Sequence, residues 1–305
     1  REKRVIIEEI KMYEENPIMH IDDLLEEAVF DGHVLGRNIA GTPDSLRAMT
    51  REDVLAYRDT FYRPENMVIV AAGSLAESTF SRIEETFGSV PAREGEIPAD
   101  IPFSSAFEQG RIRRQYKDVE QVQVSLGFPT VGRGHVDEMP LRLLGSILGG
   151  TMSSRLFVEV RERRGLCYTI RSGAQSYQDA GMFTIRAGLD AARLPEALQV
   201  ICDELKKVVQ EGVSPEELSM VKDHVRGSLA LSLEDSADRA EFYARKLLFL
   251  GKIEEPLERL ARYDAVTQED IARVARTYFS FDKLSLAAIG PFSSDEELAA
   301  MLPKV

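Results

Sequence analysis

Two glutamates near the start of the sequence are spaced so that they could act together. Glu2 and Glu9 are seven residues apart in segment 2–15, whose apolar periodicity predicts a helix. Seven residues turn through about 700° at 3.6 residues per turn, so both carboxylates project from one face. Ile10 borders this face, so one interpretation is that the two acids are partly buried, and buried paired carboxylates are costly unless a cation joins them. The alternative is a solvated face of mixed charge, which the neighbouring Lys3 favours.

Arg161 and Tyr168 are also seven residues apart, at a predicted corner between a helix and a strand. Gly165 is expected to end the helix, because glycine readily adopts the conformation that closes helices, and Leu166 to begin the strand. Segment 153–171 holds two glutamates and five arginines, which are Arg155, Arg161, Arg163, Arg164 and Arg171. Such a cluster suits a carboxylate or a developing oxyanion. The alternative is an exposed run of charge that binds nothing.

The remaining reactive residue types show no catalytic or metal-binding pattern. The four histidines are too far apart in sequence to form an HxxEH or HExxH pair; they are His20, His33, His135 and His224. Cys167 and Cys202 have no zinc-ribbon spacing, and no histidine stands where it would indicate thiol catalysis. Cys167, next to Tyr168, is therefore interpreted as a packing residue.

The elements that must position these residues alternate between helices and strands. Apolar residues at helical spacing predict helices at 2–15, 19–30, 50–62, 76–87, 136–148, 154–162, 194–210, 215–232, 236–250 and 267–278. Alternating or continuous apolar runs predict strands at 67–73, 119–128, 166–177, 181–189 and 284–289. Residues 119–128 alternate as a half-buried strand would. We therefore expect an α+β fold, with helices on one face of a sheet that is mainly antiparallel.

An internal repeat is visible at an offset of 217 residues. Segments 50–73 and 267–290 align without a gap, and each reads as a helix, an aromatic stop and a strand. Thr50 and Thr267 are each followed by acidic residues, which is typical of a helix start. Duplication explains this match better than chance similarity of two helix–strand units.

The repeat predicts the domain organisation. Residues 91–110 are rich in proline and glycine and are expected to form a linker. Residues 1–90 are then the C-terminal half of a first repeat, and residues 111–305 are the second repeat. The first half of the first repeat is expected to lie upstream of Arg1, so the first domain is incomplete here.

Composition limits the classes of function. The chain has 305 residues and a formal net charge of −13, which disfavours nucleic acid and anionic membranes as partners. No apolar run approaches the roughly 18–20 residues that span a bilayer. Two cysteines form no disulfide framework, so the reducing cytoplasm is the expected location.

Taken together, these segments resemble the insulinase-type zinc peptidases with an inverted motif, which include pitrilysin and the mitochondrial processing peptidase. Segment 2–10, Glu-Lys-Arg-Val-Ile-Ile-Glu-Glu-Ile, is similar to the family helix that supplies the third zinc ligand. Segments 148–157 and 160–168 are similar to the long signature of the family's second domain. The resemblance covers essentially the whole chain and is nearest to the small bacterial processing-protease branch. It implies the family's duplicated two-domain fold, with helix-covered sheets that are mainly antiparallel.

The resemblance also implies roles for individual residues. Glu9 corresponds to the zinc-binding glutamate, and Glu2 to the acidic residue two turns earlier that supports the site. Arg161 and Tyr168 correspond to the pair in the second, substrate-contacting domain that binds the peptide near the scissile bond. The HxxEH motif, with two histidine ligands and the general base, is absent from this sequence. We therefore expect the 305-residue chain alone to be inactive and to bind zinc poorly.

Two functions remain open at this point. One is a zinc-dependent metalloendopeptidase that hydrolyses peptides or unfolded segments, with one zinc ion per full-length subunit. The other is a non-catalytic partner or scaffold subunit of a two-chain peptidase. Glu9 favours the first, because a non-catalytic subunit needs no ligand glutamate. Arg161 and Tyr168 in the same chain favour a one-gene enzyme, for which we expect a homodimer. The signature at 148–168 disfavours a binding module of unrelated function.

Overall fold

The computed structural model describes residues 2–91, 95–99, 101–103 and 110–303. Its contacts divide the chain into two compact units. Unit 1 contains residues 1–43, 102–222 and 263–305, and unit 2 contains residues 44–101 and 223–262. The predicted division into a partial first repeat, a linker and a second repeat stays a prediction.

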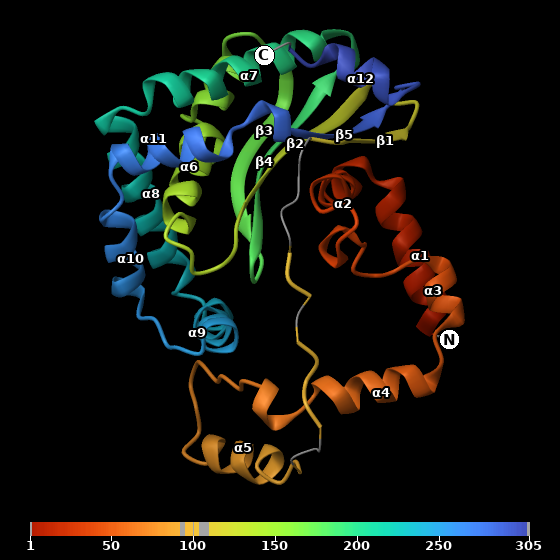
Figure 1. Ribbon diagram of the computed structural model, residues 1–305. Coiled ribbons are helices and arrows are strands. Elements are labelled where there is room, and N and C mark those ends of the chain that lie inside the picture. Colours follow the sequence, from red (N-terminus) through yellow and green to blue (C-terminus); the bar gives the residue numbers. More distant parts are fainter. Residues whose placement is uncertain (1, 92–94, 100, 104–109, 304–305) are drawn as a thin grey trace. The chain divides into compact units, whose positions relative to one another are not determined.

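Unit 1 is built on one five-stranded sheet (Figure 1). Its strands are β1 (Ile112–Tyr116), β2 (Gln121–Val131), β3 (Cys167–Ser176), β4 (Ala180–Asp190) and β5 (Ser285–Gly290). They lie in the order β1-β5-β2-β4-β3, with β1 parallel to β5 and all other neighbours antiparallel. Strand β3 is therefore an edge strand.

Helices of unit 1 cover both faces of this sheet. Its helices are α1 (Glu2–Glu15), α2 (Pro17–Val29), α6 (Glu138–Gly149), α7 (Leu194–Glu211), α11 (Gln268–Tyr278) and α12 (Asp295–Met301). Three of them, α6, α7 and α11, pack against one another and the sheet on one face (Figure 1). Helix α2 packs on the other face, against β2 and β5. The expectation of helices on one face only is wrong.

The two faces have separate apolar cores. Under α6, α7 and α11, the ring of Phe279 lies 5.0 Å from that of Phe128 and 4.9 Å from that of Phe183. Under α2, Ile21, Leu25 and Val29 repeat every four residues and pack with apolar side chains of β4 and β5. Both faces are buried, so the prediction that 119–128 is half-buried is wrong.

Strand β2 explains why the prediction of a half-buried strand is wrong. Its polar residues Gln123 and Ser125 face α2 and are only 5% and 0% exposed. Alternation of polar and apolar residues normally marks one solvated face. Here a helix distant in sequence covers the polar side, which no local pattern in 119–128 encodes.

Ion pairs and hydrogen bonds fix α2 along its flanks. Asp22 accepts from Arg186 on β4 at 2.5 Å, and Glu27 accepts from Arg113 on β1 at 2.8 Å. The Tyr177 hydroxyl donates to Glu26. Burial raises the pKa of Glu26 above its ordinary value of 4.5, with the Tyr177 hydrogen bond opposing this.

The capping boxes and helical turns recur at the offset of 217 residues. Helices α4 (Arg51–Phe61) and α11 begin and end 217 residues apart, as do the short turns Pro64–Asn66 and Phe281–Lys283. The hydroxyl oxygens of Thr50 and Thr267 accept from the backbone N–H groups of Asp53 and Asp270. In return, the carboxylates of Asp53 and Asp270 accept from the backbone N–H groups of the two threonines. The two copies thus share their local structure, because these capping bonds are local in sequence.

The copies differ at the predicted strand. Of the predicted strand 284–289, residues 285–289 belong to β5, between β1 and β2, whereas residues 67–73 form no strand, so the prediction for 67–73 is wrong. Met67 and Ile69 are 42% and 43% exposed, while their counterparts Leu284 and Leu286 are 8% and 0% exposed. A strand needs partners for its backbone groups, and no described residue pairs with 67–73.

Unit 2 is helical. It contains α4, α5 (Thr79–Phe87) and α9 (Ser236–Leu250), and α3 (Pro43–Ala48), α8 (Pro215–Ser232) and α10 (Pro256–Asp264) cross its boundaries. Glu254 is buried, forms an ion pair with Lys246 at 2.9 Å and accepts a hydrogen bond from Arg262 at 2.7 Å, which ties α9 to α10.

The predicted helices and the other strands agree with the structure within a few residues, except that 154–162 is an α-turn followed by a π-helix. The structure adds β1, α3, α10 and α12, which the sequence did not predict. Within the described part of the chain, no helix is long and apolar enough to cross a membrane.

Candidate peptide-binding site

The predicted corner lies between a π-helical turn, Phe157–Glu162, and the start of β3. Gly165 has φ of +58°, a conformation that side-chain-bearing residues rarely adopt, and it turns the chain from the helix to the strand. π-Helical turns are uncommon and are frequent at functional sites. The corner is thus built by a wide helical turn and one glycine.

The corner brings Arg161 and Tyr168 together. The guanidinium carbon of Arg161 lies 5.6 Å from the ring centre of Tyr168 and 4.7 Å from that of Phe157. Cation–π attraction holds the guanidinium between two rings while its N–H groups keep their hydrogen-bonding capacity. Among the described residues, neither Arg161 nor Tyr168 has a side-chain hydrogen bond or ion pair. Sequence reasoning missed Phe157, although its position four residues before Arg161 places both on one side of a helical turn.

An irregularity in the sheet sets the direction of Tyr168. Cys167 pairs with Leu189 and Thr169 pairs with Gly188, so Tyr168 is an extra residue on β3. Such β-bulges re-aim a side chain and are common next to active sites. The Tyr168 side chain is 72% exposed. The bulge therefore presents a phenol to solvent beside the guanidinium of Arg161.

Three of the five arginines in this segment have structural roles. Arg155 donates to both carboxylate oxygens of Glu217, at 2.6 and 2.7 Å. Arg163 and Arg164 both pair with Glu159. The hydrogen bond from Arg164, opposed by burial and aided by the charge of Arg163, holds the pKa of Glu159 below its ordinary value.

That pairing leaves Arg161 and Arg171 without a carboxylate partner among the described residues. The sequence indicated Arg161 by its spacing to Tyr168, but it could not separate Arg171 from the other three arginines. A bound anion or carbonyl group can therefore accept hydrogen bonds from these two guanidinium groups.

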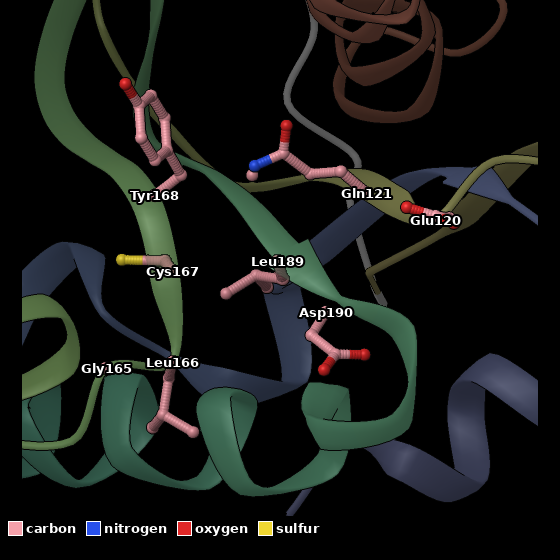
Figure 2. A pocket seen from close by; sticks show the side chains of 9 residues that line it. Glu120, Gln121, Gly165, Leu166, Cys167, Tyr168, Leu189 and Asp190 are labelled. Carbon is pink, nitrogen blue, oxygen red and sulfur yellow. The ribbon is translucent and has the colours of Figure 1, made fainter.

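A pocket of about 320 Å³ opens beside Tyr168 (Figure 2). Tyr168 and Gln121 project from β3 and β2 at its opening, and Glu120 and Asp190 also line it. Cys167 lines the same pocket, and burial raises the pKa of its thiol to about 11, opposed by the charge of Arg161. The thiol is therefore protonated at neutral pH, which disfavours a nucleophilic role.

The two glutamates of α1 lie on the solvent-exposed side of the helix. Glu2 and Glu9 are both exposed, which agrees with the alternative of a solvated face and not with partial burial. The helix buries Ile7 and Ile10 instead, so the two carboxylates face solvent. Their roles in a zinc site stay predictions.

The described residues do not by themselves form a zinc site. Glu9 is a single exposed carboxylate, and no group of three or more His, Cys, Asp or Glu side chains in the described chain could hold a metal ion. A catalytic zinc ion normally takes three protein ligands. One of the four histidines, His135, is instead engaged locally, accepting from the backbone of Asp137 at 3.1 Å.

The fold and this corner define the class of protein. The model for the family described as "Peptidase M16 inactive domain" matches residues 48–225. A zinc protease of Bacillus subtilis named YmxG and described as uncharacterized is 35% identical over 291 residues, covering 95% of this chain and 70% of that relative. An uncharacterized zinc protease of Mycobacterium tuberculosis, Rv2782c, is 34% identical over 304 residues, covering 99% and 69%. The chain therefore belongs to the M16 peptidase family.

Solved structures show the same fold. A protease from Helicobacter pylori superposes with a TM-score of 0.87 at 23% identity, covering 95% of this chain and 71% of that one. An M16-like peptidase from Alicyclobacillus acidocaldarius superposes with a TM-score of 0.82 at 20% identity, covering 94% and 69%. The expected mixed α and β architecture of an insulinase-type peptidase is thus confirmed.

Proposed function

We propose that this chain supplies the peptide-binding part of a zinc-dependent metalloendopeptidase that acts on peptides or unfolded segments. The observation that carries this proposal is the placement of Arg161 between Phe157 and Tyr168, with its N–H groups free of other described side chains. Membership of the M16 family and relatives named as zinc proteases support it.

The chemistry of the corner suits peptide recognition. The planar Arg161 guanidinium can donate two parallel hydrogen bonds to peptide carbonyl oxygens, and the exposed Tyr168 hydroxyl can donate a third. Donors fixed in this way also stabilise a carbonyl oxygen that gains negative charge. Arg161 and Tyr168 would thus hold the peptide and its developing oxyanion.

For zinc, the proposal concerns one protein ligand, Glu9. We propose that Glu9 contributes a carboxylate to a zinc site whose other ligands are not among the described residues, with Glu2 supporting it. No chemical step is assigned to the metal. Replacement of Glu9 by Gln in a zinc-loaded form of the protein should lower the zinc content measured by atomic absorption, and undiminished zinc would refute this ligand.

The decisive experiment for peptide recognition measures binding of an unfolded peptide to the wild-type chain and to Arg161→Gln. A hydrogen bond to a charged group is worth about 1.5–3 kcal/mol, so the variant should bind roughly 10- to 100-fold more weakly. Arg163→Gln is the matched control, because it changes the charge equally and Arg163 is paired with Glu159. Equal affinity of wild type and Arg161→Gln would refute the proposal.

A second candidate function is a non-catalytic partner subunit of a two-chain peptidase. The match to a family model described as an inactive domain favours it, as does the lack of a three-ligand group among described residues. Both candidates predict peptide binding at Arg161. They differ in zinc dependence: a chelator should abolish hydrolysis by the enzyme, whereas a partner subunit should hydrolyse nothing without a second, different chain.

Partners and location complete the proposal. We propose a homodimer, which light scattering of the purified protein would test, since a monomer at micromolar concentration contradicts it. Both cysteines are free, which suits the proposed cytoplasmic location.

A further inference from the structure

The turn that carries Arg161 closes through wide backbone hydrogen bonds. The N–H of Arg163 donates to the carbonyl of Val158, five residues back, and the N–H of Leu166 donates to the carbonyl of Val160, six residues back, both at 2.9 Å. The first bond is wider than the four-residue closure of an α-helix and is rare, and the second is typical of a helix that ends at a glycine. The side chains that hold this turn therefore decide where the guanidinium of Arg161 lies.

One side of the turn lines a groove of about 570 Å³. The groove is bounded by the turn, by β3 and by the end of α6, and its lining includes Phe157, Arg161, Ile170, Ser172 and Gly149. Phe157 and Arg161 are four residues apart and so share this side of the turn. A peptide bound at the corner would touch side chains of this lining.

Glu159 lies on the other side of the turn. It is two residues from both Phe157 and Arg161, and helical residues two apart do not face each other. Its side chain is only 16% exposed, and the charge of Lys207 on α7 attracts its carboxylate. Glu159 is thus directed toward α7, so an effect of this residue on peptide binding must pass through the turn.

Arg164 reaches back over the turn and binds Glu159 twice. One guanidinium nitrogen donates to the Glu159 carboxylate at 2.5 Å and to the backbone carbonyl of the same residue at 2.8 Å. These bonds join residues on either side of Arg161 in sequence. Arg163 also pairs with the carboxylate, but its side chain is 66% exposed, and exposed pairs of this kind contribute little. The pair of Glu159 and Arg164 is therefore the main tie across the turn.

The backbone at the end of the turn is anchored to the start of α7. Arg193 donates to the carbonyl oxygens of Arg164 at 3.3 Å and Gly165 at 3.4 Å, and it forms an ion pair with Glu196 at 3.1 Å. The backbone of Arg164 is thus held from α7, while its side chain holds Glu159. This arrangement fixes both ends of the segment that presents Arg161.

We propose that Glu159 is a positioning residue for peptide binding, which acts through Arg164 to fix Arg161 between its two aromatic rings. This inference deepens the proposed function and rests on it, because it assumes that Arg161 binds the peptide. Without the tie, the turn can relax toward ordinary α-helical closure, and the guanidinium loses its fixed place. A donor that is already fixed binds more tightly than one that must be ordered on binding.

The first test observes the guanidinium directly by NMR spectroscopy. Protons over the face of an aromatic ring resonate upfield, so the Nε proton of Arg161 should give an upfield signal, which Arg161→Gln identifies by its loss. We expect Glu159→Gln to move this signal to the random-coil position and Arg163→Gln to leave it in place. A signal that is not upfield in the wild type, or that Glu159→Gln does not move, would overturn the inference.

The second test measures affinity for a labelled, unfolded peptide with acetylated and amidated ends by fluorescence anisotropy. Glu159→Gln should weaken binding about 3- to 10-fold, which is less than the loss in Arg161→Gln, because the guanidinium is still present but no longer fixed. In the Arg161→Gln background the same substitution should have no effect. A merely structural role of Glu159 would weaken binding equally in both backgrounds, and that result would contradict the proposal.

Variants of the two arginines assign the effect to one ion pair. Arg164→Gln should weaken binding as much as Glu159→Gln does, and the double variant should bind no more weakly than either, because each change breaks the same pair. Arg163→Gln removes the same charge from the same turn and should keep the wild-type affinity. Additive losses in the double variant would refute the role of this pair.

The results for Arg161→Gln separate this inference from the proposed function. If Arg161→Gln binds the peptide as tightly as the wild type, the proposed function is refuted, and this inference with it. If Arg161→Gln binds weakly but Glu159→Gln binds like the wild type, peptide recognition by Arg161 stands and only the positioning role is refuted. If Glu159→Gln does not fold, Arg164→Gln carries both tests, because it breaks the same tie from the exposed side.

Discussion

The ion pair between Asp137 and Arg273 offers the sharpest test of how unit 1 is held together. Asp137 begins α6 and its side chain is 7% exposed; one oxygen lies 2.7 Å from Arg273 and the other accepts from the Tyr278 hydroxyl at 2.7 Å. Both partners belong to α11 or its end. The carboxylate therefore fastens α6, which forms one wall of the groove, to α11.

Replacement of Asp137 by Asn keeps the shape and removes the charge. A hydrogen bond to a charged group contributes about 1.5–3 kcal/mol, and the loss should be smaller here because Arg273 is 44% exposed and partly screened. The Tyr278 hydroxyl can still donate to the amide oxygen. We expect Asp137→Asn to lower the free energy of unfolding by about 1–2 kcal/mol at neutral pH.

The assay is urea unfolding followed by far-ultraviolet circular dichroism, since the chain contains no tryptophan. Asp223→Asn is the matched control, because its ion pair with Arg226 is exposed and should contribute about 0–1 kcal/mol. The chain has two compact units, which can unfold in separate transitions. The midpoints of the individual unfolding transitions are therefore compared.

The pH dependence of the free energy of unfolding provides a second test of this ion pair. Although burial acts to raise it, hydrogen bonds from Arg273 and Tyr278 hold the pKa of Asp137 below its ordinary 3.8. A depressed folded-state pKa contributes stability that is present above 3.8 and is lost as the pH falls through the folded-state value. The difference between wild type and Asp137→Asn should therefore shrink at acid pH. A difference that is absent at neutral pH, or that grows on acidification, would refute the reasoning.

Three further predictions concern the corner, the groove and unit 2. Tyr168→Phe should bind peptide more weakly, by roughly 3- to 10-fold for one lost hydrogen bond, with unchanged circular dichroism; full affinity in a binding titration would contradict this. Gly149→Ala should destabilise the chain by about 1–3 kcal/mol in urea through the close backbone contact, whereas Gly173→Ala, whose Cβ would meet nothing within 4 Å, is the control for losing a glycine. Glu254→Gln should cost about 3 kcal/mol, because Lys246 would remain buried without its partner, and a neutral effect on unfolding would show that the buried charge is not needed.

The comparison of the two helix–strand copies shows where local sequence stops deciding structure. Helices α4 and α11 have the same bounds after the offset because a threonine cap and helical periodicity are local. Residues 67–73 have the apolar run of β5 but form no strand. Strand formation depends on neighbours that are distant in sequence, so the same pattern gave two outcomes.

The residues of the candidate site were also predicted only in part from the sequence. The sequence indicated Arg161 and Tyr168 by their spacing, and Gly165 as the turn between them. It did not show that Phe157 supports the guanidinium or that a bulge turns Tyr168 outward, because cross-strand register is not encoded locally. It left open whether Glu2 and Glu9 are partly buried or solvated, and packing of the opposite face of α1 leaves both exposed.

What the sequence determined by itself was most of the helices, four of the five strands, the threonine caps, the repeat and the family signature, since these rest on short-range periodicity and residue type. Only the tertiary structure decided which charges are free. Apart from Arg161, the arginines in segment 153–171 look alike in sequence, yet Glu217 and Glu159 neutralise three of them and leave Arg171, like Arg161, without a carboxylate partner among the described residues. Ion pairing between residues distant in sequence made that selection, because an arginine is available to a ligand only where folding brings no carboxylate to it.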